Sequence, residues 1–240
     1  MMGLFGAYFY FVSRIASAGE KQLVCHTINV TILDSLDNYF ITPREVANMV
    51  KEQTIGRSLQ DVDTYLLEET LVKRGVIATA EAYIVAPDKL EVEITQREPV
   101  VRLYNDKNGF YADKSGFILP LMPNHPQDLP VVTGHLPIEL EEGFRGYPKN
   151  HTQLSSIISV TEFIRNNAYW SREVEQIDIE QNSDLVLYMK GRNFKVIFGD
   201  CNNIQKKFDK LAAFYKSILE SEKGAGYTSV KLKYENQILC

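Results

Sequence analysis

The chain has 240 residues, of which 45% are hydrophobic and 24% charged, values that fit a globular protein of one or two domains. Its formal net charge of -5 argues against a nucleic-acid-binding protein, which usually carries a basic face. The three cysteines, Cys25, Cys201 and Cys240, are far apart and form neither a zinc-binding spacing nor a disulfide framework, although one Cys25–Cys240 bridge stays open.

The first stretch, residues 1–12, is uncharged and rich in aromatic residues. It is too short for a membrane-spanning helix, which needs roughly 20 apolar residues, and it lacks the basic start of a signal peptide. The aromatic cluster at residues 8–11, followed by Arg14, is typical of the interfacial end of a membrane helix. We therefore expect residues 1–23 to be a partial transmembrane and juxtamembrane segment. The alternative is a buried amphipathic helix or an apolar leader sequence.

The next stretch opens with a strand and a helix. Alternation of Ile28, Val30 and Ile32 with mostly polar residues predicts a strand. Residues 42–45 (Thr-Pro-Arg-Glu) form a capping box with proline at the first helical position, and Gly56 ends the helix. The apolar stripe of this helix consists of Val46, Met49 and Val50.

A second helix is predicted to open at Ser58, whose hydroxyl can cap free N–H groups, and to stop at Gly75. Its expected buried face consists of Leu59, Val62, Leu66 and Leu71. A β-hairpin follows, with strands at residues 78–85 and 90–95 joined by a turn at Pro87-Asp88. The resulting order, β-α-α-β-β, leaves one sheet face without helices, so residues 24–98 are expected to form one small domain.

Residues 99–240 have a different, β-rich pattern, which predicts a second domain. A turn at Asn108-Gly109 and another at residues 113–116 separate short apolar runs. Further strands are expected at residues 130–133, 174–179, 185–189, 194–198 and 227–234, and helices at 152–167 and 203–221. The first of these helices is expected to carry Leu154, Ile157, Ile158, Thr161 and Ile164 on one face. In the last helix Lys206, Lys207 and Lys210 lie on the polar side and are interpreted as a solvated face.

Five short motifs in this order resemble the FtsQ/DivIB family of bacterial division proteins, over roughly residues 24–235. They are Gln96-Arg97-Glu98-Pro99-Val100, the D-x-x-G turn at 113–116, the L-P-x-x-x-G segment at 129–134, Phe198-Gly199, and Val230-Lys231-Leu232-Lys233-Tyr234. The β-α-α-β-β unit looks like a POTRA domain. In the last motif Lys231 stands where the family usually has aspartate.

The resemblance implies an α+β protein, with a POTRA domain followed by a β-rich domain that carries two helices. It also implies a single-pass protein of the bacterial inner membrane with its bulk in the periplasm. Such a protein is a non-enzymatic scaffold that joins FtsB-like and FtsL-like division proteins and needs no cofactor. Two alternatives stay open: a POTRA-containing module of an outer-membrane assembly or secretion system, and an enzyme with an unrecognised site.

The candidate partner-binding residues lie on two strands that are expected at sheet edges. The final strand contributes Ser229, Val230, Lys231, Leu232, Lys233 and Tyr234, and the first hairpin strand contributes Glu81 and Tyr83. Because no strand follows residues 227–234, we expect its outer N–H and C=O groups to be free for a partner strand. Lys231 and Lys233 would favour an acidic partner segment, such as an FtsB-like coil, and Tyr234 would anchor it. The hairpin edge is either covered by a flanking loop or open to another division protein.

Overall fold

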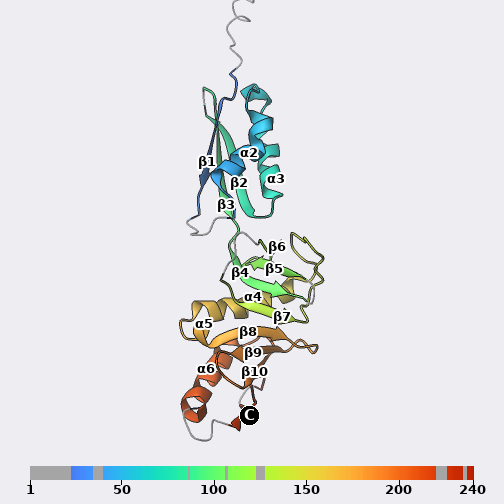
Figure 1. The fold of residues 1–240 in the computed structure, drawn as a ribbon, viewed down its shortest axis with the longest axis vertical. Coiled ribbons are helices and arrows are strands. Elements are labelled where there is room, and N and C mark those ends of the chain that lie inside the picture. Colours follow the sequence, from blue (N-terminus) through green and yellow to red (C-terminus); the bar gives the residue numbers. More distant parts are fainter. Residues whose placement is uncertain are drawn as a thin grey trace, which may run out of the picture. The chain divides into compact units, whose positions relative to one another are not determined.

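The computed structural model describes residues 23–34, 40–85, 87–105, 108–122, 128–219, 226–234 and 237–240 (Figure 1). The chain forms two compact units, Met1–Gln96 and Arg97–Cys240, each with its own hydrophobic core. No helix in the described part of the chain is long and apolar enough to cross a membrane. Residues 1–22 of the partial transmembrane and juxtamembrane segment that was expected at residues 1–23 lie outside the described residues.

The N-terminal unit has the predicted β-α-α-β-β order, and its strands form one three-stranded sheet. The strand order is β1-β3-β2, with β1 parallel and β2 antiparallel to the central strand β3. The elements are β1 (Thr27–Ile32), α2 (Pro43–Thr54), the 3-10 turn η1 (Leu59–Asp61), α3 (Thr64–Val72), β2 (Ile77–Val85) and β3 (Lys89–Gln96).

The start of α2 confirms the predicted capping box. The Thr42 hydroxyl accepts a hydrogen bond from the Glu45 N–H at 3.3 Å, and the Glu45 carboxylate accepts one from the Thr42 N–H at 2.8 Å. Both bonds satisfy N–H groups that a helix start leaves unpaired. With the helix fixed at Pro43, Val46 and Val50 fall on its inner face and are fully buried.

The second helix differs from the prediction. Ser58 makes no side-chain cap bond and leads only into the 3-10 turn, whereas α3 begins at Thr64 and is capped by the Asp63 carboxylate. Because the 3-10 turn breaks the helical period, the inner face of α3 shifts. Leu67 and Leu71 are buried, and Leu66 is 47% exposed, so the expected burial of Leu66 is wrong.

This shift gives a direct stability test. Leu67→Ala should lower the free energy of unfolding of the N-terminal unit by about 2–5 kcal/mol, because it leaves a cavity in the core. Leu66→Ala is the matched control on the exposed side and should change it by less than about 0.5 kcal/mol. Native-state hydrogen exchange of the β3 amides measures both values, and equal effects for the two variants would contradict the assigned face.

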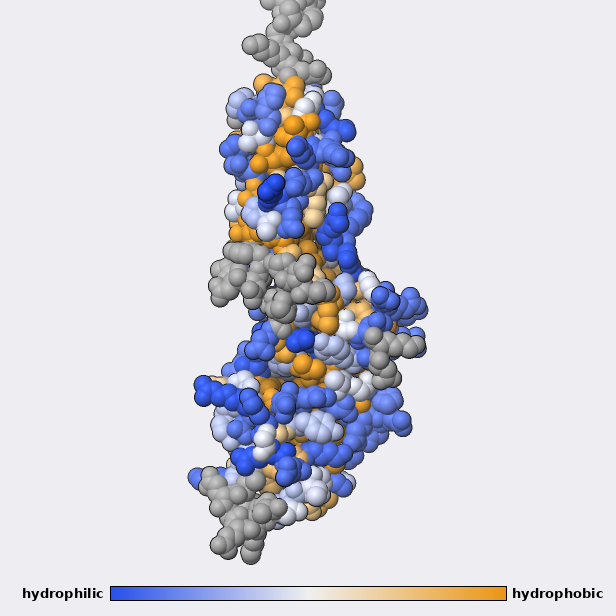
Figure 2. Space-filling model, viewed as in Figure 1, coloured by the Kyte–Doolittle hydropathy of each residue, from blue (hydrophilic) through white to orange (hydrophobic). Residues whose placement is uncertain are grey.

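The two sides of the N-terminal sheet are covered unequally. In the central strand β3, Leu90, Val92 and Ile94 are fully buried, whereas Glu91, Glu93 and Thr95, which alternate with them on the opposite face, are half-buried. Figure 2 shows a hydrophobic band on this unit, over the region of β1 and α2. Two helices therefore do not fully cover the sheet, as the β-α-α-β-β order predicts.

The C-terminal unit is built on an eight-stranded sheet with the order β11-β10-β9-β8-β7-β4-β5-β6. Its strands are β4 (Pro99–Tyr104), β5 (Gly109–Asp113), β6 (Ile118–Pro120), β7 (Val131–Gly134), β8 (Val174–Ile179), β9 (Leu185–Met189), β10 (Lys195–Gly199) and β11 (Ser229–Lys231). Its helices are α4 (His151–Asn166), α5 (Trp170–Glu173), α6 (Ile204–Phe214) and the π-helical turn η2 (Tyr215–Leu219).

The helices of this unit close its core. All five residues expected on the inner face of α4 are buried: Leu154, Ile157, Ile158, Thr161 and Ile164. The last helix was predicted as α-helical through residue 221, but its α-helical part ends at Phe214 and a π-helical turn follows. Phe208 and Leu211 of α6 pack into the same hydrophobic cluster as the sheet and α4.

The D-x-x-G turn of the sequence is built around one carboxylate. Asp113 accepts hydrogen bonds from the N–H groups of Ser115 and Phe117 at 2.8 and 3.0 Å. Its other oxygen accepts one from Arg97 at 2.8 Å, and the Arg97 guanidinium lies 3.6 Å from the centre of the Phe117 ring. Gly116 supplies the positive φ that the turn requires. The arginine and the turn are therefore one packed unit at the start of the β-rich domain.

Candidate partner-binding site

The final strand, β11, is shorter than the expected residues 227–234 and pairs in parallel with β10. The Lys195 N–H donates to the Thr228 carbonyl at 3.2 Å, and the Leu232 N–H donates to the Ile197 carbonyl at 2.9 Å. Residues 228, 230 and 232 therefore direct their backbone groups toward β10. By the alternation of a strand, Ser229, Lys231 and Lys233 direct theirs outward.

The outer edge of β11 is not open along its whole length. Lys231 donates its N–H to the Leu239 carbonyl at 2.7 Å and accepts the Leu239 N–H at 3.3 Å. The expectation that no later residue pairs with this strand is thus wrong, because the chain turns back after Tyr234. Among the described residues, the outward backbone groups of Ser229 and Lys233 have no backbone partner.

The side chains of residues 230–234 fall into a buried group and an exposed group. Val230 and Leu232 are fully buried, Lys231 and Lys233 are exposed, and Tyr234 is 40% exposed. Lys233 is not a free cation, since its ammonium contacts the Asp184 carboxylate at 2.9 Å. The hydrogen bond that Lys233 donates to Asp184, together with the charge of that carboxylate, raises the pKa of Lys233. Lys231 is exposed and has no ion pair within the described part of the chain, so its charge, unlike that of Lys233, is not balanced by a carboxylate there.

Two of the three lysines of α6 correct the interpretation of a solvated face, whereas Lys206 is exposed as expected. Lys207 is buried and its ammonium contacts the Asp200 carboxylate at 2.5 Å, which lowers the pKa of Asp200. Lys210 donates to the carbonyls of Leu232 and Tyr234 at 2.9 and 2.6 Å. Both carbonyls follow the last residue of β11 that pairs with β10, Lys231, so Lys210 bonds the chain where the sheet ladder stops. It therefore holds the segment that leads from β11 to Tyr234.

The glycine of the Phe198-Gly199 motif makes room for the same segment. Gly199 has a φ of +79°, and a Cβ placed there would lie 2.6 Å from the Lys233 Cβ. A side chain at this position would therefore displace residue 233 in addition to straining the backbone. Gly134, at the end of the L-P-x-x-x-G segment, makes room for the end of β8 in the same way, since a Cβ there would lie 2.4 Å from the Ile179 carbonyl oxygen.

The second candidate edge is β2, which carries Glu81 and Tyr83. Both side chains are exposed, and the Tyr83 hydroxyl donates to the Glu93 carboxylate at 2.7 Å, which raises the pKa of Tyr83. The Ala82 N–H donates to the Glu68 carboxylate of α3 at 2.8 Å. A helix side chain, rather than a flanking loop, thus occupies the middle of this edge.

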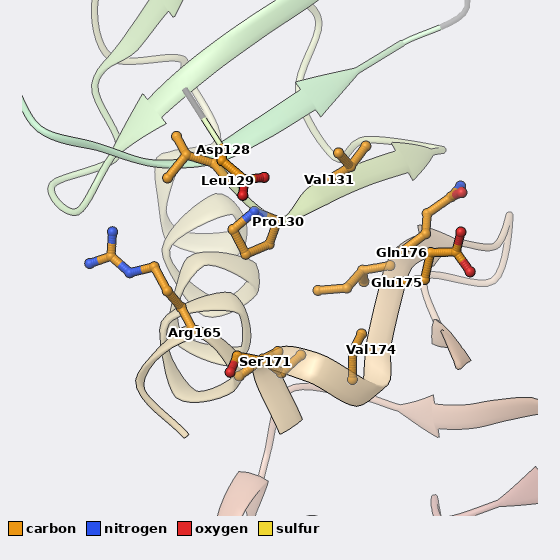
Figure 3. Close-up of a pocket in the computed structure, with 11 residues that line it drawn as sticks. Asp128, Leu129, Pro130, Val131, Arg165, Ser171, Val174, Glu175 and Gln176 are labelled. Carbon is orange, nitrogen blue, oxygen red and sulfur yellow. The ribbon is translucent and has the colours of Figure 1, made fainter. Parts of the chain in front are cut away.

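One hollow of the C-terminal unit, of about 290 Å³, lies between the residues before β7, the end of α4, α5 and the start of β8 (Figure 3). Its polar lining includes Arg165, Ser171 and the carboxylates of Asp128 and Glu175, with no histidine. Among the described residues, no group of three or more His, Cys, Asp or Glu side chains is placed to hold a metal ion.

Comparison with known families agrees with this architecture. Residues 98–240 match the family described as FtsQ/DivIB, C-terminal related, and residues 23–95 match a POTRA-like domain. The chain belongs to the FtsQ/DivIB family. The motifs that suggested this family include the Asp113 turn and the two glycines that lie close to a neighbouring segment, Gly134 and Gly199.

A curated relative points the same way. The chain is 24% identical over 173 residues to a protein of Geotalea daltonii named cell division protein FtsQ. The match covers 71% of this chain and 60% of the relative, so it spans less than two thirds of the relative's length. Together with the family match, this similarity supports a cell-division protein of the FtsQ type.

Proposed function

We propose that this FtsQ/DivIB-family chain is a non-enzymatic scaffold of the bacterial division machinery, which binds FtsB-like and FtsL-like proteins by strand addition at β11. The observation that carries this proposal is the outer edge of β11, where Ser229 and Lys233 present unpaired backbone groups within the described part of the chain. A partner strand can complete this edge with main-chain hydrogen bonds, and its side chains can supply selectivity.

The proposal includes the location of the protein. Family membership and the aromatic run at residues 8–11 before Arg14 support an inner-membrane anchor, with the two folded units in the periplasm. The family match over residues 98–240 favours division over the alternative, a module of an outer-membrane assembly or secretion system. Such a module would need a barrel of alternating strands after the POTRA domain.

The chemistry around β11 suits an extended segment that carries at least one acidic residue. Lys231 supplies the cation, whereas the charge of Lys233 is balanced by Asp184. Tyr234 presents a large side chain beside the edge, and tyrosine often forms the energetic centre of such contacts. The β2 edge, with Glu81 and Tyr83, is a second contact in this proposal, and a strand added there must displace the Glu68 carboxylate from Ala82.

Replacement of the aromatic anchor tests the site. Tyr234→Ala should weaken binding of the FtsB-like periplasmic segment by roughly 2 kcal/mol or more, because it removes the side chain next to the paired edge. Tyr188→Ala is the matched control, since Tyr188 is 41% exposed and lies on β9, two strands away in the sheet. Isothermal titration calorimetry with the purified chain gives both values, and the proposal is wrong if Tyr234→Ala binds like the parent.

A further inference from the structure

The segment formed by residues 237–240 already lies on the edge that the partner strand would use. It runs antiparallel to β11 and forms both hydrogen bonds of the bridge between Lys231 and Leu239. Ile238 is partly buried and packs against the hydrophobic cluster of the C-terminal unit, whereas Leu239 and Cys240 are exposed. This segment, which we call the tail, thus combines main-chain pairing with one apolar contact, as an added strand does.

The tail uses only part of the edge. Ser229, Lys231 and Lys233 together offer three outward N–H groups and three outward C=O groups, and the tail pairs with those of Lys231 alone. A strand that continued alongside Ser229 and Lys233 could form bonds at all three residues. The part of the edge that the partner strand would use at Lys231 is therefore already occupied by residues 237–240.

We propose that the tail is an intramolecular competitor, which occupies the strand-addition site until a partner strand displaces it. The proposal rests on the proposed function of β11. It also specifies the partner segment: an extended strand, antiparallel to β11, with an apolar side chain at the position of Ile238 and enough length to reach both Ser229 and Lys233. The tail raises the selectivity of the edge, because a strand that pairs only with Lys231 gains nothing by replacing it.

The strength of this competition follows from the two hydrogen bonds. At typical net values for backbone bonds, two of them correspond to a roughly 5- to 150-fold preference for the tail-bound state. Because a partner binds only the open state, its apparent affinity falls by about the same factor. Release of the tail should therefore tighten partner binding by about 10-fold.

Two variants release the tail in different ways. One ends at Tyr234, and the other is Leu239→Pro, which removes the N–H that bonds to the Lys231 carbonyl but keeps Ile238. Cys240→Ser is the matched control, because Cys240 is exposed and takes no part in the bridge. The readouts are hydrogen exchange of the Lys231 amide by NMR, and binding of two ligands: the FtsB-like periplasmic segment and a synthetic peptide of residues 235–240 with serine at position 240.

The expected result has three parts. The Lys231 amide should be protected in the parent and in Cys240→Ser, should exchange rapidly in both release variants, and should regain protection when the peptide is added to the chain that ends at Tyr234. Both release variants should bind the FtsB-like segment about 10-fold more tightly than the parent. Circular dichroism and Trp170 fluorescence establish that each variant is folded.

Other outcomes separate this inference from the proposed function. A Lys231 amide that stays protected in both folded release variants would overturn the inference, as would equal affinity of parent and release variants for the segment. If the FtsB-like segment binds none of the chains, the proposed partner is wrong. The tail is then tested only by adding the peptide to the chain that ends at Tyr234 and measuring exchange of the Lys231 amide. Protection regained with the peptide supports the inference, and its absence overturns it.

Discussion

Asp113→Ala should lower the free energy of unfolding of the C-terminal unit by about 3–5 kcal/mol, because it removes one partner of a buried ion pair. The side chains of Arg97 and Asp113 are only 12% and 9% exposed. Without the carboxylate, the guanidinium stays buried with its charge uncompensated, and the N–H groups of Ser115 and Phe117 lose their acceptor. Urea unfolding followed by the fluorescence of Trp170 measures the change, since this single tryptophan is buried in the same unit.

The neighbouring Lys114→Ala is the control for this prediction. Lys114 also forms an ion pair, with Glu162 at 3.9 Å, but its side chain is 79% exposed. Exposed pairs of this kind contribute about 0–1 kcal/mol, so Lys114→Ala should unfold nearly like the parent. A loss below about 1 kcal/mol for Asp113→Ala would show that the turn does not depend on its carboxylate.

In the chain that ends at Tyr234, where no tail competes, Lys231→Pro should weaken binding of the FtsB-like segment by at least about 100-fold, because proline has no N–H at the centre of the outer edge and its ring occupies the space that the partner backbone must approach. The parallel ladder to β10 does not use this N–H, since Val230 and Leu232 direct their backbone groups toward β10. The fold should therefore tolerate the change, in contrast to proline at position 232, which would remove the bond to Ile197.

Lys231→Met separates the backbone from the charge. It keeps the N–H and removes only the exposed ammonium, so we expect a loss of less than about 10-fold at moderate salt. Calorimetric titration of the segment into each folded variant gives the two affinities. Retention of parental affinity in Lys231→Pro would exclude main-chain pairing at this residue, and equal losses in both variants would assign the effect to charge.

The elements could be predicted from the sequence wherever the signal is local. The capping box at Thr42, the alternation in β3 and the apolar stripe of α4 each involve residues a few positions apart, and the structure confirms all three. The error in α3 is also local in origin. Ser58 and Asp63 both resemble helix caps, and only packing selects Asp63, which moves Leu67 inward in place of Leu66.

The site was less predictable because its contacts are long-range. The partners of Lys233 and of the Leu232 carbonyl are Asp184 and Lys210, which lie 49 and 22 positions away in the chain. No periodic pattern links such residues. The polar side of a helix is usually solvated, and the buried state of Lys207 follows only from the presence of Asp200 beside it. Likewise, nothing in the short run Gln237-Ile238-Leu239 predicts that Leu239 pairs with Lys231.

The most direct test of strand addition at β11 is amide hydrogen exchange, followed by NMR, on the parent chain with and without the FtsB-like periplasmic segment. Ser229 and Lys233 are the informative amides, because their outward N–H groups have no partner among the described residues, whereas Lys231 is already bonded to Leu239. We predict that the segment protects Ser229 and Lys233 and leaves Val230 and Leu232 unchanged. Binding of the segment without added protection at Ser229 and Lys233 would contradict strand addition at this edge.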